Sequence, residues 1–171
     1  SLKEWQKKIG YVPQQIYLSD DSVAVNIAFG VDVKDIEYDK IVQASKIANL
    51  HEFVTNELPL QYQTSIGERG VRLSGGQSQR IGIARALYHE AKVLVFDEAT
   101  SALDNQTEKA VMEALQDISK EITTIIITHR LNTIRDCDEI FFLEKGEVKG
   151  QGSYDKLIKS NDLFKKFAHI N

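Results

Sequence analysis

The sequence predicts an α/β fold with a mostly parallel sheet and an inserted, largely helical segment. Two apolar segments of strand length, Lys92–Phe96 and Thr123–Thr128, are separated by a helix-length segment. The first lacks alternating polar residues, which is typical of a parallel strand buried on both faces. Strands that alternate with helices form a parallel sheet with crossover helices. From about residue 20 to residue 88 the pattern indicates almost only helix and loop, and we interpret this block as a helical subdomain inserted into the sheet domain.

The first half of the chain is predicted to begin with a short buried strand at Lys8–Pro13, which the proline ends because it has no amide hydrogen to donate. A turn and a short helix follow at Asp20–Gly30, where the glycine is placed to end the helix. Tyr38–Leu50 carries apolar residues at helical spacing. Ser65–Gly76 is a loop with four glycines, and it leads into a helix. Gln79 lies off the apolar stripe of that helix.

The second half of the chain is predicted to complete the sheet and to end in a hairpin and two helices. Its central helix is amphipathic and would cross over between the two apolar strands. A Lys-Gly pair at 145–146 is a turn sequence between two strand-like runs. The predicted elements are strands at Lys92–Phe96 and Thr123–Thr128, a helix at Asn105–Ser119, a hairpin of Glu139–Leu143 with Glu147–Lys149, and helices near Tyr154–Lys159 and Asp162–His169.

Composition narrows the classes of protein that the chain can belong to. With 171 residues, of which 42% are hydrophobic and 27% are charged, the chain can bury a core of its own. Its 21 basic and 25 acidic residues give a net charge of −4, which argues against general nucleic-acid binding. The single cysteine, Cys137, cannot form an internal disulfide, which fits a reducing compartment. No apolar run reaches the length of a membrane span, and no segment resembles a signal peptide.

The segment Leu73–Gln77, with the sequence LSGGQ, is the first candidate site. Gly75 and Gly76 would let backbone amides approach an anion without a side chain in the way, and the helix that follows adds a partial positive charge. Ser74 could cap that helix or turn toward a phosphate oxygen. Read alone, the segment is an ordinary helix cap. Its place 20 residues before an acidic strand end makes phosphate binding the better interpretation.

Two carboxylates follow directly after the strand at Val93–Phe96. Asp97 at such a strand end is placed as phosphate-transferring ATPases place the carboxylate that holds magnesium. Glu98 could then polarise an attacking water. A strand end capped by surface acids is the simpler alternative. The turn that follows, Ser101–Asp104, makes that alternative improbable and presents a third carboxylate at Asp104.

Further candidates lie where other predicted strands end. Gln14 follows the first strand and His129 follows the strand at Thr123–Thr128, so both are expected at the carboxyl edge, where α/β sheets place ligands. An amide such as Gln14 can bridge a metal and a water. The imidazole of His129 could contact a terminal phosphate or order the water. Glu68 and Arg69 are charges on a glycine-flanked loop, which by itself indicates only a solvated turn.

Taken together, these motifs resemble the nucleotide-binding domain of ATP-binding cassette (ABC) proteins, in order and over nearly the whole chain. LSGGQ is similar to the family signature, and Val93–Glu98 is similar to its Walker B strand with the catalytic glutamate. Ser101–Asp104 resembles the D-loop, His129 the switch histidine, and Val12–Gln14 the Q-loop. The resemblance implies an ATPase that uses ATP and Mg²⁺.

Site roles follow from this resemblance. Asp97 and Gln14 would attend the magnesium ion, while Glu98 and His129 would serve hydrolysis, together with Gln14 and Asp104. Ser74, Gly75, Gly76 and Gln77 would bind the γ-phosphate of an ATP that is held mainly by a second such domain in a head-to-tail dimer.

The resemblance also points to a membrane exporter. Ser65–Gly70, with the sequence SIGERG, looks like the loop that faces the transmembrane partner in ABC exporters. Transmembrane domains would therefore contact this domain near Gln14 and near Glu68 and Arg69, at the cytoplasmic face of the membrane. ATP binding and hydrolysis would be coupled to export.

One departure from the family is large. The P-loop, GxxxxGK[ST], does not occur in these residues, and neither does the aromatic residue that stacks on adenine upstream of it. In the family both lie before the Q-loop, so we expect an N-terminally truncated P-loop NTPase-like (ABC ATPase) fold. Its expected parts are residues 1–19 with the Q-loop strand, residues 20–89 with the helical signature subdomain, and residues 90–171 with the Walker B, D-loop and H-loop segments and the C-terminal helices. Alone, such a chain is expected to bind ATP weakly and to hydrolyse almost none.

Two other functional readings stay open. The first is a soluble ABC-type ATPase that acts on DNA or the ribosome, although such relatives usually carry long coiled coils or paired cassettes and neither is visible here. The second is a stand-alone module that binds a protomer without being an enzyme. The cargo is not encoded in these residues, because membrane domains mainly select it in ABC exporters.

Overall fold

The computed structural model describes residues 2–6, 8–68, 70–118 and 122–170. They divide into two compact units, residues 1–127 and residues 128–171. The predicted separation of residues 20–89 as a subdomain stays a prediction, since that segment packs with the sheet strands in one core of the first unit.

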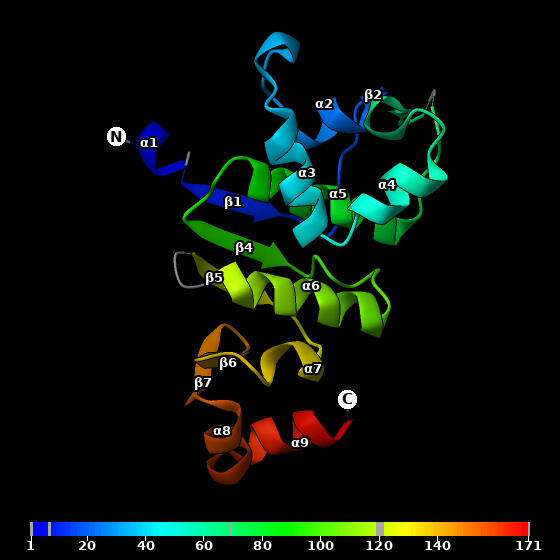
Figure 1. Ribbon diagram of the computed structural model, residues 1–171. Coiled ribbons are helices and arrows are strands. Elements are labelled where there is room, and N and C mark those ends of the chain that lie inside the picture. The colour runs from blue at the N-terminus through cyan, green and yellow to red at the C-terminus, as the bar shows by residue number, and fades with distance from the viewer. Residues whose placement is uncertain (1, 7, 69, 119–121, 171) are drawn as a thin grey trace. The chain divides into compact units, whose positions relative to one another are not determined.

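The first unit is built on a parallel sheet of the strands β1 (Ile9–Val12), β4 (Val93–Asp97) and β5 (Thr123–Ile127), in the order β1-β4-β5 (Figure 1). Val12 is paired with Phe96, and Asp97 with Ile127. The three strands run in the same direction, so their carboxyl ends lie at one edge. The predicted parallel sheet is therefore confirmed.

The two faces of this sheet differ in burial. Val12, Leu94 and Phe96 are at most 2% exposed and belong to the core. On the other face Ile125 and Ile127 are about half exposed, at 48% and 51%. The prediction that the Walker B-like strand is buried on both faces was wrong in part, because every second residue of β4 is only half-buried.

The helices α2 to α6 share their apolar faces with that core, and α6 lies beside the sheet in Figure 1. Two of the elements are short antiparallel strands that pair with each other. The elements besides the parallel sheet are α1 (Leu2–Gln6), β2 (Asp21–Ser22), α2 (Val23–Ile27), the 3₁₀ helices η1 (Val33–Asp35) and η2 (Gln61–Gln63), α3 (Tyr38–Ile47), α4 (His51–Glu57), β3 (Ser65–Ile66), α5 (Gly75–Tyr88) and α6 (Asn105–Ile118).

Three details of the helical segment differ from the sequence prediction. The helix α2 already ends at Ile27, and Gly30 adopts a left-handed φ of 88° three residues later. The helix α3 ends at Ile47 because the chain turns at Asn49, whose φ is 52°, and the separate helix α4 follows. The loop at residues 65–76 contains the short strand β3, which two residues of sequence pattern could not reveal.

The second unit contains α7 (Leu131–Ile134), β6 (Ile140–Glu144), β7 (Glu147–Gly152), α8 (Tyr154–Ser160) and α9 (Asp162–Ile170). The strands β6 and β7 are antiparallel, as predicted. Lys145 and Gly146 both have positive φ, 51° and 79°, which is the backbone of a two-residue turn that matches the twist of a hairpin. Ile140, Leu157 and Phe164 form a small core of this unit.

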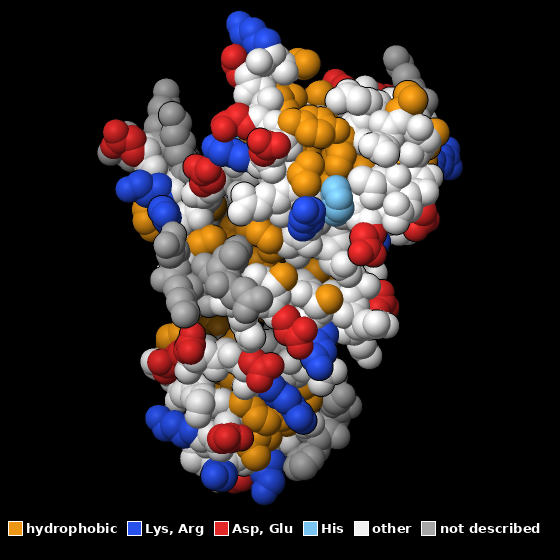
Figure 2. All heavy atoms as spheres, viewed as in Figure 1, with side chains coloured by type: hydrophobic (Ala, Val, Ile, Leu, Met, Phe, Trp, Pro, Cys, Tyr) orange, Lys and Arg blue, Asp and Glu red, His pale blue; other side chains and the backbone are white. Residues whose placement is uncertain are grey.

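The surface carries charge of both signs. On the face shown in Figure 2, acidic and basic side chains alternate without a large area of one sign. Among the described residues, no helix combines the length and the apolar character that a bilayer crossing requires.

Candidate functional site

The ends of β1 and β4 bring two of the predicted site residues together. Gln14 lies two residues after β1, and Glu98 comes directly after β4. The amide Nε2 of Gln14 donates a hydrogen bond to Oε2 of Glu98 at 3.2 Å. The parallel pairing of these strands therefore places an amide and a carboxylate, 84 positions apart in the sequence, in direct contact.

Asp97 has a partner that the sequence analysis missed. The hydroxyl of Tyr11 donates a hydrogen bond to Oδ2 of Asp97 at 2.8 Å. Tyr11 is paired with Val95 in the sheet. Asp97 lies two residues after Val95 on β4, so its side chain is on the same face of the sheet as that of Tyr11. The hydrogen bond to Asp97 raises the pKa of Tyr11, which keeps the phenol protonated as a donor. The alternation of side chains along the strands was the signal that could have found it.

Glu98 has a backbone conformation that side-chain-bearing residues seldom adopt. Its φ is 49°, in the left-handed region. The surrounding backbone fixes this conformation: the amide of Glu98 donates to the carbonyl of Ile127 at 2.9 Å, and the amide of Ser101 donates to the carbonyl of Glu98 at 3.0 Å. Such strained residues cluster at functional sites, where the strain holds a side chain in a required direction.

The N-terminus of α5 is the second part of the site. Ser74 caps the helix: its hydroxyl accepts from the amide of Gln77 at 3.2 Å, and its own amide donates to Oε1 of Gln77 at 2.8 Å. This reciprocal arrangement is a capping box. The cap is the role of Ser74 that the structure shows, and its phosphate-binding role stays a prediction. The side chain of Gln77, however, is turned back onto the cap.

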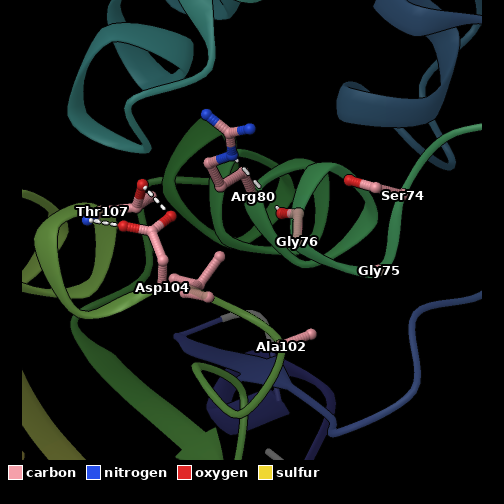
Figure 3. Close-up of a pocket in the computed structure, with 8 residues that line it drawn as sticks. Ser74, Gly75, Gly76, Arg80, Ala102, Asp104 and Thr107 are labelled. Atoms are coloured by element: carbon pink, nitrogen blue, oxygen red, sulfur yellow. Dashed lines mark hydrogen bonds between the residues drawn. The ribbon is translucent and has the colours of Figure 1, made fainter.

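An open hollow of about 340 Å³ lies beside this helix terminus. It is lined by Ser74, Gly75, Gly76, Arg80, Ala102, Leu103, Asp104 and Thr107, and Figure 3 shows most of these side chains. The structure thus places Asp104 with the signature segment. We refer to this hollow as the signature pocket.

Asp104 is held in the signature pocket by the first turn of α6. Its Oδ1 accepts from the amides of Gln106 and Thr107 at 3.1 and 2.9 Å, and its Oδ2 accepts from the Thr107 hydroxyl at 2.7 Å. The backbone and side-chain hydrogen bonds from Thr107 lower the pKa of Asp104. The carboxylate is therefore ionised and fixed at neutral pH, as a helix cap and as a wall of the pocket.

The two signature glycines lie where an added side chain would crowd the neighbouring segment. A Cβ atom added to Gly75 would lie 3.3 Å from Cβ of Ala102. One added to Gly76 would lie 3.1 Å from the carbonyl oxygen of Ala102. The D-loop segment therefore rests directly on the backbone of the first turn of α5.

Arg80 is a further residue of the signature pocket that sequence reasoning missed. Its NH1 donates to the carbonyl of Asn49 at 2.7 Å, and its Nε donates to the carbonyl of Gly76 at 3.4 Å. Burial lowers its pKa, while the charges of Asp104 and Glu57 oppose this shift. A cation is thus held one turn from the glycines. Its spacing of four residues from Gly76 was the only signal in the sequence.

Three predicted residues are not joined to this site by the described structure. His129 is the second residue of the second unit, two residues after the end of β5, and it is described only within that unit. Glu68 is exposed on its loop. Arg69 lies outside the described residues. Their roles stay predictions.

The residues at the strand edge fit a magnesium ion that is completed by other ligands. Among the described residues there is no group of three or more acidic, histidine or cysteine side chains that could cage a metal. Magnesium instead commonly takes one or two carboxylates together with waters and phosphate oxygens. Asp97, anchored by Tyr11 at Oδ2, with Gln14 on the neighbouring strand end, is a donor set of that kind.

Comparison with known proteins identifies the family. The family model described as "ABC transporter" matches residues 1–101. A solved structure of a bacterial Atm1-family ABC exporter with ATP bound is similar over 99% of this chain and 29% of that chain, with a TM-score of 0.91 and 37% identity. The chain belongs to the ABC transporter family.

Its curated relatives are much longer proteins. An ATP-dependent lipid A-core flippase of Pasteurella multocida is 44% identical over 169 residues, which is 99% of this chain and 29% of the relative. The corresponding flippase of Francisella novicida is 43% identical over 96% of this chain and 27% of its own length. A multidrug resistance ABC transporter ATP-binding and permease protein of Lactococcus lactis is 40% identical over 98% and 28%. The chain spans less than a third of each.

Proposed function

We propose that this chain is part of the ATPase domain of an ABC exporter and couples ATP binding and hydrolysis to transport across a membrane. One observation carries the proposal: the first unit holds both an acidic strand edge, where Gln14 contacts Glu98 at 3.2 Å, and a glycine-lined pocket at a helix N-terminus. The names of its relatives, which include flippases and a multidrug transporter, support the exporter class.

ATP and Mg²⁺ are the ligands that these two places would take. Asp97, with Gln14 beside it, would hold the metal, which would neutralise charge on the phosphate oxygens. Glu98 would accept the proton of the attacking water at its carboxylate. His129 would assist at the terminal phosphate.

The signature pocket would serve a different ATP molecule. The hollow beside the start of α5 is lined by residues of the signature segment, the D-loop and α6, and not by Gln14, Asp97 or Glu98 of the strand edge. In a head-to-tail dimer, Ser74, Gly75 and Gly76 would close over the γ-phosphate of an ATP that the second nucleotide-binding domain holds, with Asp104 beside it. Gln77 would act through the cap of Ser74.

The transmembrane domains would contact this domain near Gln14 and near Glu68 and Arg69, at the cytoplasmic face of the membrane. Binding of two ATP molecules would draw two such domains together, and hydrolysis would separate them again. This cycle would move the transmembrane domains.

The gene upstream of these residues tests the proposal. We expect a P-loop and, before it, transmembrane helices in the same or a neighbouring reading frame, together with ATPase activity of the purified transporter. A second cassette or long heptad repeats in place of membrane helices would support the soluble ATPase that acts on DNA or the ribosome. A gene that starts near Ser1, with no ATPase partner, would support a binding module.

A further inference from the structure

The side chain of Gln79 joins the two parts of the site. It projects from α5 one turn after the signature glycines and is 3% exposed. Its Oε1 accepts a hydrogen bond from the amide of Ala102 at 2.9 Å. Its Nε2 donates to the carbonyl of Gln14 at 3.3 Å and to the hydroxyl oxygen of Ser101 at 3.2 Å.

With these three hydrogen bonds, the carbonyl and both N–H groups of the buried amide each have a partner. The carbonyl has one donor from the backbone, and the two hydrogens of the NH₂ group have one acceptor each. No other residue type of similar size offers an acceptor and two donors in one plane. A buried amide that is satisfied by three separate partners costs little to bury and resists displacement.

The partners of Gln79 belong to both functional segments of the first unit. Gln14 is the residue whose side chain contacts Glu98 at the strand edge. Ala102 is the residue that rests on Gly75 and Gly76 in the signature pocket. A shift of one segment by a few tenths of an ångström must therefore either move the other segment or stretch a hydrogen bond of a buried side chain.

We propose that Gln79 is a positioning residue that couples the strand edge, which serves one ATP, to the signature pocket, which serves the other. This inference rests on the proposed function and on the head-to-tail dimer within it. Gln79 touches no nucleotide itself. It sets the position of the Gln14 backbone relative to Ala102. Binding of ATP at one nucleotide site therefore changes the affinity for ATP at the other.

The variant Gln79→Met tests the link, because methionine has a similar length and no amide. Ile81→Val is the matched control: Ile81 is on the same helix, is 1% exposed, and belongs to the apolar core. In the 171-residue chain, we expect Gln79→Met to raise the hydrogen-exchange rate of the Ala102 amide about tenfold, the effect of losing one buried hydrogen bond. Ile81→Val should change the exchange rate of the Ala102 amide only as far as it lowers the overall free energy of unfolding.

In the intact transporter, Gln79→Met should lower kcat about tenfold, change KM for ATP less than about twofold, and bring the Hill coefficient for ATP toward 1. Gln79→Glu separates the two halves of the link, since a carboxylate can still accept from Ala102 but cannot donate to Gln14. We expect it to keep the Ala102 amide protected and still to lose cooperativity. If methionine prevents folding, Gln79→Asn can replace it. Its side chain is one methylene shorter, and we expect the same changes in amide exchange, kcat and cooperativity as for Gln79→Met.

Normal kcat and cooperativity in the Gln79→Met transporter would overturn the inference, and so would equal losses in Gln79→Met and Ile81→Val. Either result would leave the proposed function standing as long as the wild-type transporter hydrolyses ATP. A wild-type transporter without ATPase activity would reject the proposed function itself, and the inference with it.

Discussion

The strand edge and the signature pocket are built in opposite ways. At the strand edge, long side chains reach across the sheet, as in the hydrogen bonds of Gln14 with Glu98 and of Tyr11 with Asp97, and the groups are partly exposed. At the signature pocket the backbone of Gly75 and Gly76 lies so close to Ala102 that an added Cβ would be crowded, at 3.3 and 3.1 Å. The strand edge is therefore defined by its polar side chains, whereas the signature pocket is defined by the missing side chains of its two glycines.

The largest effect is expected at the strand edge. Glu98→Gln keeps the shape of the side chain but cannot take a proton, so turnover of the intact transporter should fall about 10²–10⁴-fold. Binding of ATP should stay within about twofold, since the glutamine leaves Asp97, the proposed metal ligand, in place. Steady-state ATPase and equilibrium ATP-binding assays measure both. Glu113→Gln, at an exposed carboxylate of α6, is the control, and an unchanged rate in Glu98→Gln would remove Glu98 from the role of base.

The next effect concerns the pocket. In a nucleotide-binding domain that includes the P-loop, Gly76→Ala should weaken ATP-dependent dimerisation about tenfold or more, because the new Cβ would crowd the backbone carbonyl of Ala102 at 3.1 Å. The free energy of unfolding should change by less than about 1 kcal/mol, since alanine favours the helix by a similar amount.

Gly75→Ala sharpens the comparison, because its new Cβ meets only the side chain of Ala102. The double variant Gly75→Ala, Ala102→Gly should recover most of the lost dimerisation, which sedimentation velocity can measure. The same Ala102→Gly change should not rescue Gly76→Ala. Rescue of both variants, or of neither, would contradict the packing explanation.

A smaller effect is expected for the tyrosine at the strand edge. Tyr11→Phe removes one hydrogen bond from Asp97, so the magnesium concentration for half-maximal ATP binding should rise about 3–5-fold. Tyr17→Phe is the matched control, since it removes a hydroxyl from another exposed tyrosine of the first unit. Equal magnesium dependence in both variants would show that Tyr11 does not orient the carboxylate.

The smallest effect concerns the helix cap. Ser74→Ala should destabilise the first unit by about 1 kcal/mol, as measured by urea unfolding, because the capping box loses one of its two hydrogen bonds. Ser153→Ala removes the comparable cap of α8 in the second unit and should leave ATP-dependent dimerisation unchanged. A Ser74→Ala variant with full dimerisation would assign Ser74 to capping alone.

Much of the fold was predictable because its signals are local. The strands β1 and β4, the helix α6 and the hairpin at Lys145-Gly146 all have apolar periodicity or turn residues within a few positions. The helix α4 and the ribbon of β2 with β3 were missed, since the first depends on a left-handed residue at Asn49 and the second is two residues long on each side.

Only those parts of the candidate site that belong to sequence motifs or to strand ends could be predicted. Gln14, Asp97 and Glu98 were found because strand ends of a parallel sheet share an edge. Gln79 was judged only by its place off the apolar stripe of its helix, whereas its burial depends on a loop 22 and more residues later in the chain. Contacts of this kind are set by tertiary packing, and helical periodicity does not contain them.

In our proposal this chain supplies the partner-facing part and the strand edge of a nucleotide site, without the phosphate cradle. Titration of the purified 171-residue chain with MgATP tests this division. We predict no saturable binding below about 1 mM, because the P-loop that supplies most phosphate contacts is not among these residues. Saturable binding of one ATP per chain in the micromolar range would contradict the claim.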